Sequence, residues 1–200
     1  MNDAAIILIP IGVIALLGLI WLIATFNRLV SVRQHMRESW ADIDVELKRR
    51  YDLIPNLVET AKAYMKHERE TLENVIKARN TAVSANAAAS ADPGSASAIQ
   101  GLVAAEGVLS GALSRLFALA EAYPDLKANQ NMMQLTEELT GTENKISFAR
   151  QSFNDAVMSY NTSAQQFPTN VIASAFSFAP AELLKSTESD EERRPVKVQF

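Results

Sequence analysis

The sequence contains no cysteine and only two histidines among its 200 residues. The absence of cysteine excludes disulfides, catalytic thiolates, thiolate zinc sites and iron–sulfur clusters. It leaves the compartment open, because a cysteine-free chain is compatible with either side of a membrane. Glycine and proline number only seven each, whereas alanine, leucine, glutamate, lysine and glutamine are plentiful. This mixture is typical of helical proteins.

An excess of charge of one sign is also missing. The net charge is −4, and no long run of lysine or arginine occurs, so a nucleic-acid partner has little electrostatic support. We find no phosphate-binding glycine loop and no G-x-S-x-G motif. Asp42 and Asp44 are two residues apart, so on a helix they would face different directions. We therefore expect no nucleic acid, no small-molecule substrate and no enzymatic activity.

A metal site is equally unsupported by the residue pattern. A carboxylate-bridged di-iron site in a helical protein requires Glu-x-x-His on two helices. The residue three positions before His35 is Val32, and the residue three positions before His67 is Tyr64. Neither histidine fits that spacing, so we expect no metal and no cofactor.

The sequence does contain a long apolar run near its start. No residue from Ala4 to Phe26 is charged, and about twenty helical residues cover the roughly 30 Å hydrocarbon layer of a bilayer. A cleaved signal peptide is the competing interpretation, but it would begin with basic residues, and Asp3 is the only charged side chain before the run. We expect residues 1–27 to form an uncleaved transmembrane anchor.

Basic residues beside this run predict its orientation. Arg28, Arg33 and Arg37 follow the run, and no lysine or arginine precedes it. The positive-inside rule then places the short N-terminus outside and the rest of the chain in the cytoplasm.

Four segments after the anchor repeat apolar residues at three- and four-residue steps, which is the spacing of amphipathic helices. Small polar residues over 86–98 predict one substantial loop, and the other connections are short. The predicted fold class is all-α, with an up-down antiparallel four-helix bundle over residues 28–167 after the transmembrane helix. The four predicted helices are 28–53, 55–86, 99–123 and 128–167, the last with a heptad-like, coiled-coil spacing.

The connection at Asp52-Leu53-Ile54-Pro55 has two interpretations. Proline lacks a backbone N–H and disfavours a helical residue before it, which predicts a break. The apolar phase nevertheless continues through Pro55, which would fit one kinked helix. We favour a tight hairpin at Pro55, which would put this turn at the tip of the bundle farthest from the membrane.

That predicted tip gathers polar residues and is the first candidate site. One interpretation is structural, with helix caps and ion pairs such as Arg50–Glu143. The other is a docking surface for a partner protein. The residues concerned are Arg49, Arg50, Tyr51, Asp52, Asn56, Glu59, Glu143 and Asn144.

The second candidate surface lies where the chain is expected to return to the membrane. No charged residue occurs from Ala156 to Ala181, and the apolar stretch between Pro168 and Pro180 is too short to span a bilayer. We expect residues 168–185 to lie on the bilayer surface or against a neighbouring subunit, with burial under the base of the bundle as the alternative. The contacting side chains would be Phe167, Val171, Ile172, Phe176 and Phe178. The charged tail, 186–200, is predicted to be flexible.

Six stretches, in order, carry a resemblance to a known family: RESWADID (37–44), VELKRRYDLIPNLVETAKAY (45–64), HERETLENVIKAR (67–79), AYPDLKANQN (122–131), LTGTENKISFAR (139–150) and QFPTNVIASAFSF (166–178). The chain resembles the LemA family of bacterial membrane proteins over essentially its whole length, the Ala/Ser-rich stretch 84–98 being the one departure. The resemblance implies a short external N-terminus, a helical bundle on the cytoplasmic side of the bacterial cell membrane and no catalytic residues. Relatives in magnetosome membranes imply membrane organisation.

These observations lead to two functional hypotheses. The first is a non-enzymatic scaffold or interaction module at the cytoplasmic face, contacting the lipid bilayer and self-assembling into a homo-oligomer. The alternative is an adaptor or regulatory subunit of another membrane protein, such as a quality-control protease. An enzyme would need a substrate or cofactor that this composition gives no reason to expect.

Overall fold

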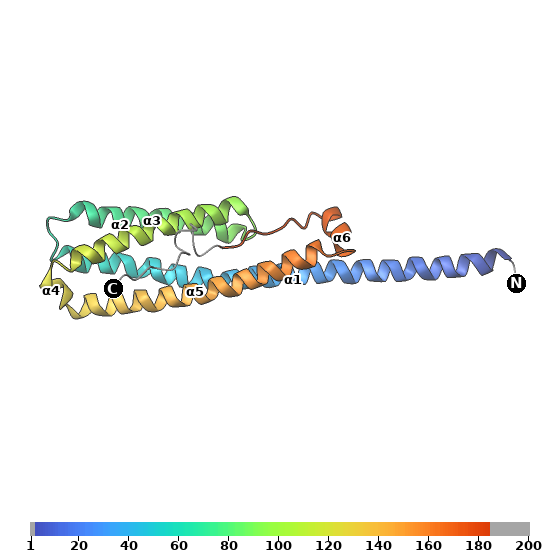
Figure 1. The fold of residues 1–200 in the computed structure, drawn as a ribbon, viewed down its shortest axis with the longest axis horizontal. Helices are drawn as coiled ribbons and strands as arrows, with labels where there is room; N and C mark the ends of the chain where they lie inside the picture. The colour runs from blue at the N-terminus through green and yellow to red at the C-terminus, as the bar shows by residue number, and fades with distance from the viewer. Residues whose placement is uncertain (1–2, 185–200) are drawn as a thin grey trace, which may run out of the picture.

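The computed structural model describes residues 3–184, and the side chains of residues 9–184. Every regular element in this range is a helix, which confirms the all-α prediction (Figure 1). The elements are α1 (Asp3–Lys62), α2 (Arg69–Ala91), α3 (Ala96–Ala120), α4 (Pro124–Lys127), α5 (Gln130–Gln165) and α6 (Thr169–Ala175). The predicted charged tail, 186–200, lies outside the described residues.

The first helix, α1, is one continuous helix of 60 residues that passes through Pro55. The predicted hairpin at Pro55 is therefore wrong, and the chain turns instead between Lys62 and Arg69. A proline inside a helix leaves the carbonyl four residues earlier without its usual donor. Here that carbonyl belongs to Tyr51, and Arg79 of α2 donates its Nε–H to it over 3.1 Å. A tertiary contact thus replaces the missing helical hydrogen bond.

The Ala/Ser-rich stretch is also more helical than expected. The second helix continues to Ala91 and α3 begins at Ala96, so the loop predicted over 86–98 shrinks to residues 92–95. Alanine is the strongest helix former, and it dominates this stretch. Ser95 then caps α3, because its side chain accepts from the backbone N–H of Ala98. The third helix ends at Ala120 rather than at 123, and α5 runs from Gln130 rather than from 128.

The long helices pack most closely as two pairs, α1 with α5 and α2 with α3, and contacts between α1 and α2 join the pairs (Figure 1). We call residues 28–184, which contain these packed helices, the body. Its α1–α5 core includes Trp40 and Phe153, whose rings meet edge to face with centroids 5.3 Å apart. Apolar residues at three- and four-residue steps on each helix supply the rest of the core.

The N-terminal part of α1 projects beyond the body with no helix beside it (Figure 1). Its large apolar side chains between residues 9 and 23 are exposed on all sides. Two of the described helices, α1 and α3, are long and apolar enough to cross a membrane. Of these, α3 packs on α2 within the body and buries Glu106, whereas the stretch of α1 packs on nothing. A long N-terminal apolar helix is therefore present, as predicted.

After α5 the chain forms α6 beside α1 and then returns along the side of α5 (Figure 1). Two asparagines of α5 hold the returning segment by their side-chain amides. Asn161 donates to the carbonyl of Ala181 and accepts from its N–H, each over 2.9 Å. Asn154 makes the same pair of bonds with Leu184, at 3.0 and 2.8 Å. These paired hydrogen bonds hold the backbone of the segment after α6 against α5.

Candidate functional site

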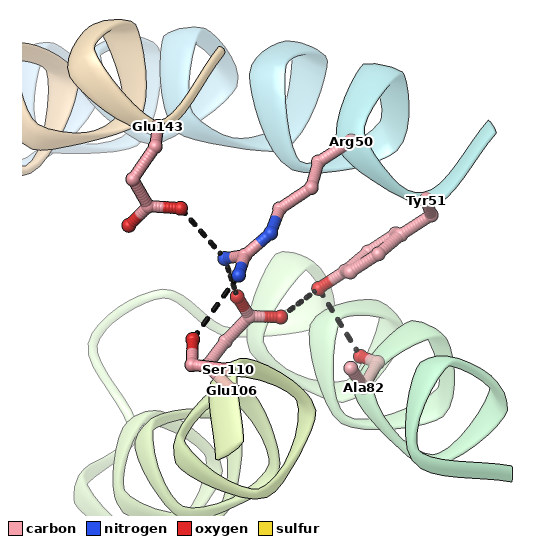
Figure 2. Close-up of polar contacts among 6 residues, drawn as sticks. All are labelled: Arg50, Tyr51, Ala82, Glu106, Ser110 and Glu143. Carbon is pink, nitrogen blue, oxygen red and sulfur yellow. Dashed lines mark hydrogen bonds and ion pairs between the residues drawn. The ribbon is translucent and has the colours of Figure 1, made fainter. Parts of the chain in front are cut away.

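A buried polar cluster lies between the helix pairs of the body, centred on Arg50 of α1 (Figure 2). Arg50 Nη1 lies 2.8 Å from Glu106 Oε2 of α3 and 3.0 Å from Glu143 Oε2 of α5. Its Nη2 donates to Ser110 Oγ over 3.1 Å. Arg50 and Glu106 expose only 5% and 4% of their surface, while Glu143 reaches the surface.

Tyr51, the next residue of α1, completes the cluster from the α2 side. Its hydroxyl donates to Glu106 Oε1 over 2.6 Å and lies 3.5 Å from the carbonyl oxygen of Ala82. Burial, and secondarily the carboxylate of Glu106, raise the pKa of Tyr51 above its ordinary value. The tyrosine therefore remains a neutral donor, and all four long helices contribute an atom to one connected network.

The two buried charges of this network, on Arg50 and Glu106, are paired with each other. Both carboxylate oxygens of Glu106 are occupied, one by Arg50 and one by Tyr51. A buried ion pair adds little net stability by itself, because desolvation offsets the attraction, but losing one partner is costly. Its effect is to admit a single relative position of the helices. The arrangement is chemically suited to aligning the helices.

Glu106 was not among the residues singled out from the sequence, although a signal was present. It falls on the apolar stripe of α3, four residues after Leu102 and three before Leu109, both of which are buried. An acidic residue on a buried stripe requires a basic partner, because an unpaired buried charge is very unfavourable. That requirement would have indicated the pairing with an arginine on another helix.

A second polar group joins α1 to α2 within the Ala/Ser-rich stretch. Asp44 Oδ1 accepts from Asn86 Nδ2 over 2.6 Å and from Ser90 Oγ over 3.0 Å. Trp40 donates its Nε1–H to the same Ser90 oxygen over 3.0 Å. Asn86 and Ser90 are four residues apart, so helix formation places both on the face that meets α1. This stretch of α2 therefore packs on α1 through specific side-chain hydrogen bonds.

The apolar segment predicted near the membrane is divided between two faces. Ile172 and Phe178 are buried, with 5% and 6% of their surface exposed. Phe167, Val171 and Phe176 are 83%, 60% and 51% exposed. Phe178 packs on Phe26 of α1, with ring centroids 5.7 Å apart, and the guanidinium carbon of Arg33 lies 4.7 Å from the Phe178 ring centroid. Only the inner face of this segment is therefore buried at the base of the body, and its other face is exposed.

The sequence of this chain matches that of a known protein family. The sequence model of the LemA family matches residues 39–200, which include the whole Arg50 cluster and α6. This chain belongs to the LemA family. The resemblance seen in the sequence is confirmed.

Two relatives of this LemA-family chain extend the match. Magnetosome protein MamQ of Magnetospirillum gryphiswaldense is 22% identical over 192 residues, covering 88% of this chain and 71% of that protein. Magnetosome protein MamQ 2 of Paramagnetospirillum magneticum is 24% identical over 189 residues, covering 85% of this chain and 70% of that protein. Both alignments span more of the chain than the body alone.

The residues predicted to form a distal docking surface do not form one in this LemA-family protein. The ion pair Arg50–Glu143, expected under the structural interpretation, is present. Because α1 continues to Lys62, however, this pair lies within the body and not at its tip. Arg50 and Tyr51 are buried and cannot be reached by a partner in this arrangement.

The remaining predicted residues are distributed over separate faces. Asp52 lies 3.8 Å from Arg79 Nη2 on the α2 side, and Glu59 pairs with Lys62 over 3.1 Å. Asn144 lines a groove beside α3 and α5. Arg49 and Asn56 point to solvent. The hairpin assumption had placed these side chains together, and the continuous helix separates them.

Two open grooves mark the distal half of the body. One follows α1 and α2, with Val58, Met65, Leu72 and Ile76 between charged side chains of both signs. The other lies between α3 and α5, lined by Phe117, Met132 and Met133 among others. In the described part of the chain no three histidine, aspartate or glutamate side chains gather as a metal site would require.

Proposed function

We propose that this LemA-family protein is a membrane-tethered, non-enzymatic scaffold of the bacterial inner membrane, with its N-terminus outside and its body in the cytoplasm. The observation that carries the proposal is the continuity of α1 from the apolar stretch to Lys62. An anchor and a body that share one helix have a fixed relative orientation. The part of α1 beyond Phe26 extends about 50 Å at 1.5 Å per residue, so the tip stands well away from the bilayer.

The buried contacts support a body that acts as a rigid unit. The Arg50 network draws atoms from α1, α2, α3 and α5, and we propose that these helices function together as one antiparallel four-helix bundle. The paired bonds of Asn154 and Asn161 hold the returning segment to the same unit. A rigid unit can present a partner surface without the entropic cost of ordering a loop.

Self-assembly is the form of scaffolding that we favour. Copies anchored by parallel helices in one bilayer present identical surfaces to one another in the same plane. Phe148 of α5 is 73% exposed, and burying an aromatic side chain is a large contribution to an interface. Relatives named as magnetosome proteins support a role in organising a bacterial membrane structure rather than in small-molecule chemistry.

The first test is the mass of the full-length protein extracted in mild detergent, together with the composition of what elutes with it. We expect a homogeneous homo-oligomer, and we expect Phe148→Glu to reduce its size by introducing a charge into the contact. Ser147→Glu is the matched control, because Ser147 is also exposed on α5 and lines neither groove. A monomeric wild-type protein that elutes alone would contradict the scaffold proposal.

The second candidate function is an adaptor for another membrane protein, and the distal α1–α2 groove favours it. Apolar Val58, Leu72 and Ile76 lie in this groove beside Lys62, Lys66 and Glu73, a mixture that suits a peptide segment of a partner. In the same experiment, an adaptor would elute as a small species with a fixed ratio of a second protein. Ile76→Lys should then abolish that ratio, whereas Phe148→Glu should leave it unchanged.

A further inference from the structure

The base of the body carries an apolar face that no described part of the chain covers. Its exposed apolar side chains are Phe167, Val171 and Phe176, and we call these three residues the collar face. They belong to α6 and its flanks, whose opposite side buries Ile172 and Phe178. The segment therefore has apolar residues on its inner and outer sides, and no residue from Ala156 to Ala181 is charged.

The collar face lies where the apolar stretch of α1 ends. The ring of Phe176 meets the ring of Phe26 edge to face, with centroids 5.0 Å apart. Phe26 is the last residue but one before Arg28, the first charged residue after the apolar run. Thr25 and Leu29 of α1 are 9% and 0% exposed, which shows that the body already covers α1 at this level.

This position determines the depth of α6 once α1 is placed across a bilayer. Residues 4–26 match the hydrocarbon thickness, so Phe26 lies near its boundary. The polar interfacial layer on each side is about 5–7 Å thick, by difference between the whole bilayer and its hydrocarbon core. Leu29 lies four residues after Thr25, about 6 Å along the helix axis. A segment that packs on α1 at this level therefore lies within the interfacial layer and not in bulk water.

The composition of the base agrees with this depth. Segments that lie in the interface bury apolar side chains such as phenylalanine at the boundary between headgroups and acyl chains and place basic side chains toward the headgroups. Arg28, Arg33 and Arg37 lie on the body side of Phe26, and Arg28, only two residues from Phe26, is within reach of anionic headgroups. The collar face is thus apolar at the depth of the lipid and flanked by positive charge on the side of the cytoplasm.

We propose that the collar face is seated in the interfacial layer of the same bilayer that α1 crosses, with lipid as its partner. The inference rests on the proposed membrane anchoring of α1. Lipid is favoured over a second copy of the chain because the face is continuous with the membrane-spanning stretch through the Phe26–Phe176 contact. Two attachments, α1 and the collar face, then fix the tilt of the body relative to the membrane plane.

Spin labels on single cysteines test this depth, and the absence of native cysteine makes each label unique. The full-length protein is placed in nanodiscs of phosphatidylcholine and phosphatidylglycerol. Labels are attached in Val171→Cys and Phe167→Cys, with Leu16→Cys as the lipid control and Val108→Cys of α3 as the exposed body control. Collision rates are measured with oxygen, which concentrates in lipid, and with a water-soluble nickel chelate.

We expect the ratio of oxygen to nickel collisions at Val171 and Phe167 to exceed that at Val108 several-fold and to approach that at Leu16. A ratio equal to that at Val108 would overturn the inference and leave the anchor intact. Protection from both reagents that disappears when the protein is diluted in lipid would instead assign the face to a second copy. Nickel access at Leu16 would mark a failure of the proposed anchoring itself.

Discussion

The two parts of α1 have the same backbone and opposite surroundings. Residues 9–23 expose apolar side chains in every direction, which suits the lipid environment that we propose for them. Residues 29–61 bury one apolar stripe and also bury Arg50 and Tyr51. A helix tolerates a buried charge where another helix supplies the counter-charge, and it tolerates exposed leucine where lipid replaces water. The surroundings, rather than helix propensity, therefore determine which residues each part can hold.

The largest effect that would test this contrast is the removal of the buried arginine. Arg50→Ala leaves Glu106 buried without its cation, and breaking a buried pair costs about 3–5 kcal/mol. We expect the free energy of unfolding to fall by that amount, measured by denaturant titration of helicity in mild detergent. The double variant Arg50→Met with Glu106→Gln keeps an acceptor for Tyr51 and removes both charges, so it should recover most of the loss. Equal destabilisation by both variants would contradict the ion-pair explanation.

The mirror-image change places an arginine in the apolar part of the same helix. Leu16→Arg puts a charge near the centre of the expected span, where insertion becomes less favourable by about 2.5–3.5 kcal/mol. We expect a smaller fraction of the protein to resist alkaline extraction from membranes. Leu16→Ala is the control and should remain integrated. If Leu16→Arg is integrated as well as wild type, residues 9–23 do not contact the hydrocarbon core.

A smaller effect concerns the proline that α1 contains within the body. Arg79→Ala removes the donor to the Tyr51 carbonyl, and a buried unsatisfied acceptor costs about 1–3 kcal/mol. In Pro55→Ala the helix regains a backbone N–H that can serve the same carbonyl. We therefore expect Arg79→Ala to cost less in the Pro55→Ala background, measured as a double-mutant cycle of unfolding free energies. Additive effects would show that the Arg79 contact does not compensate for Pro55.

The smallest effect is the response of the body to alkaline pH. The pKa of Tyr51 is raised above its ordinary value of 10.0 by burial and by Glu106. Below about pH 10 both folded and unfolded chains keep this proton. At higher pH only the unfolded chain releases it, so the free energy of unfolding falls as pH rises, by up to about 1.4 kcal/mol per pH unit for this group. We expect Tyr51→Phe to reduce that slope in unfolding titrations, and an unchanged slope would contradict the assignment.

Much of the fold followed from residue patterns because the patterns are strongly periodic. The apolar stretch of α1 and the four long helices were predicted from charge absence and from three- and four-residue spacing. Helix ends were less accurate. Pro55 and the loop over 86–98 were both interpreted as breaks from local signals, and each is overridden by contacts with another helix, Arg79 in one case and Asp44 in the other.

The candidate sites were less predictable than the helices. The ion pair Arg50–Glu143 was expected, but the more deeply buried partner, Glu106, was not. Because the chain was predicted to turn at Pro55, the cluster was expected at the tip of the body. The turn lies instead between Lys62 and Arg69. Composition grouped the residues predicted to be membrane-proximal, but their division into an inner face with Ile172 and an outer face with Val171 required the position of α6 on α1.

The sequence by itself determined the helical class, the LemA family and the location of an apolar stretch long enough to cross a bilayer. These properties depend on composition and on periodicity along one helix. The tertiary structure alone decided that α1 continues past Pro55, that Arg50 is paired with Glu106, and that the collar face points away from the body. Each of these depends on which atom of a distant helix lies beside a given group, and hydrogen bonds and burial between distant residues leave no regular spacing in the sequence.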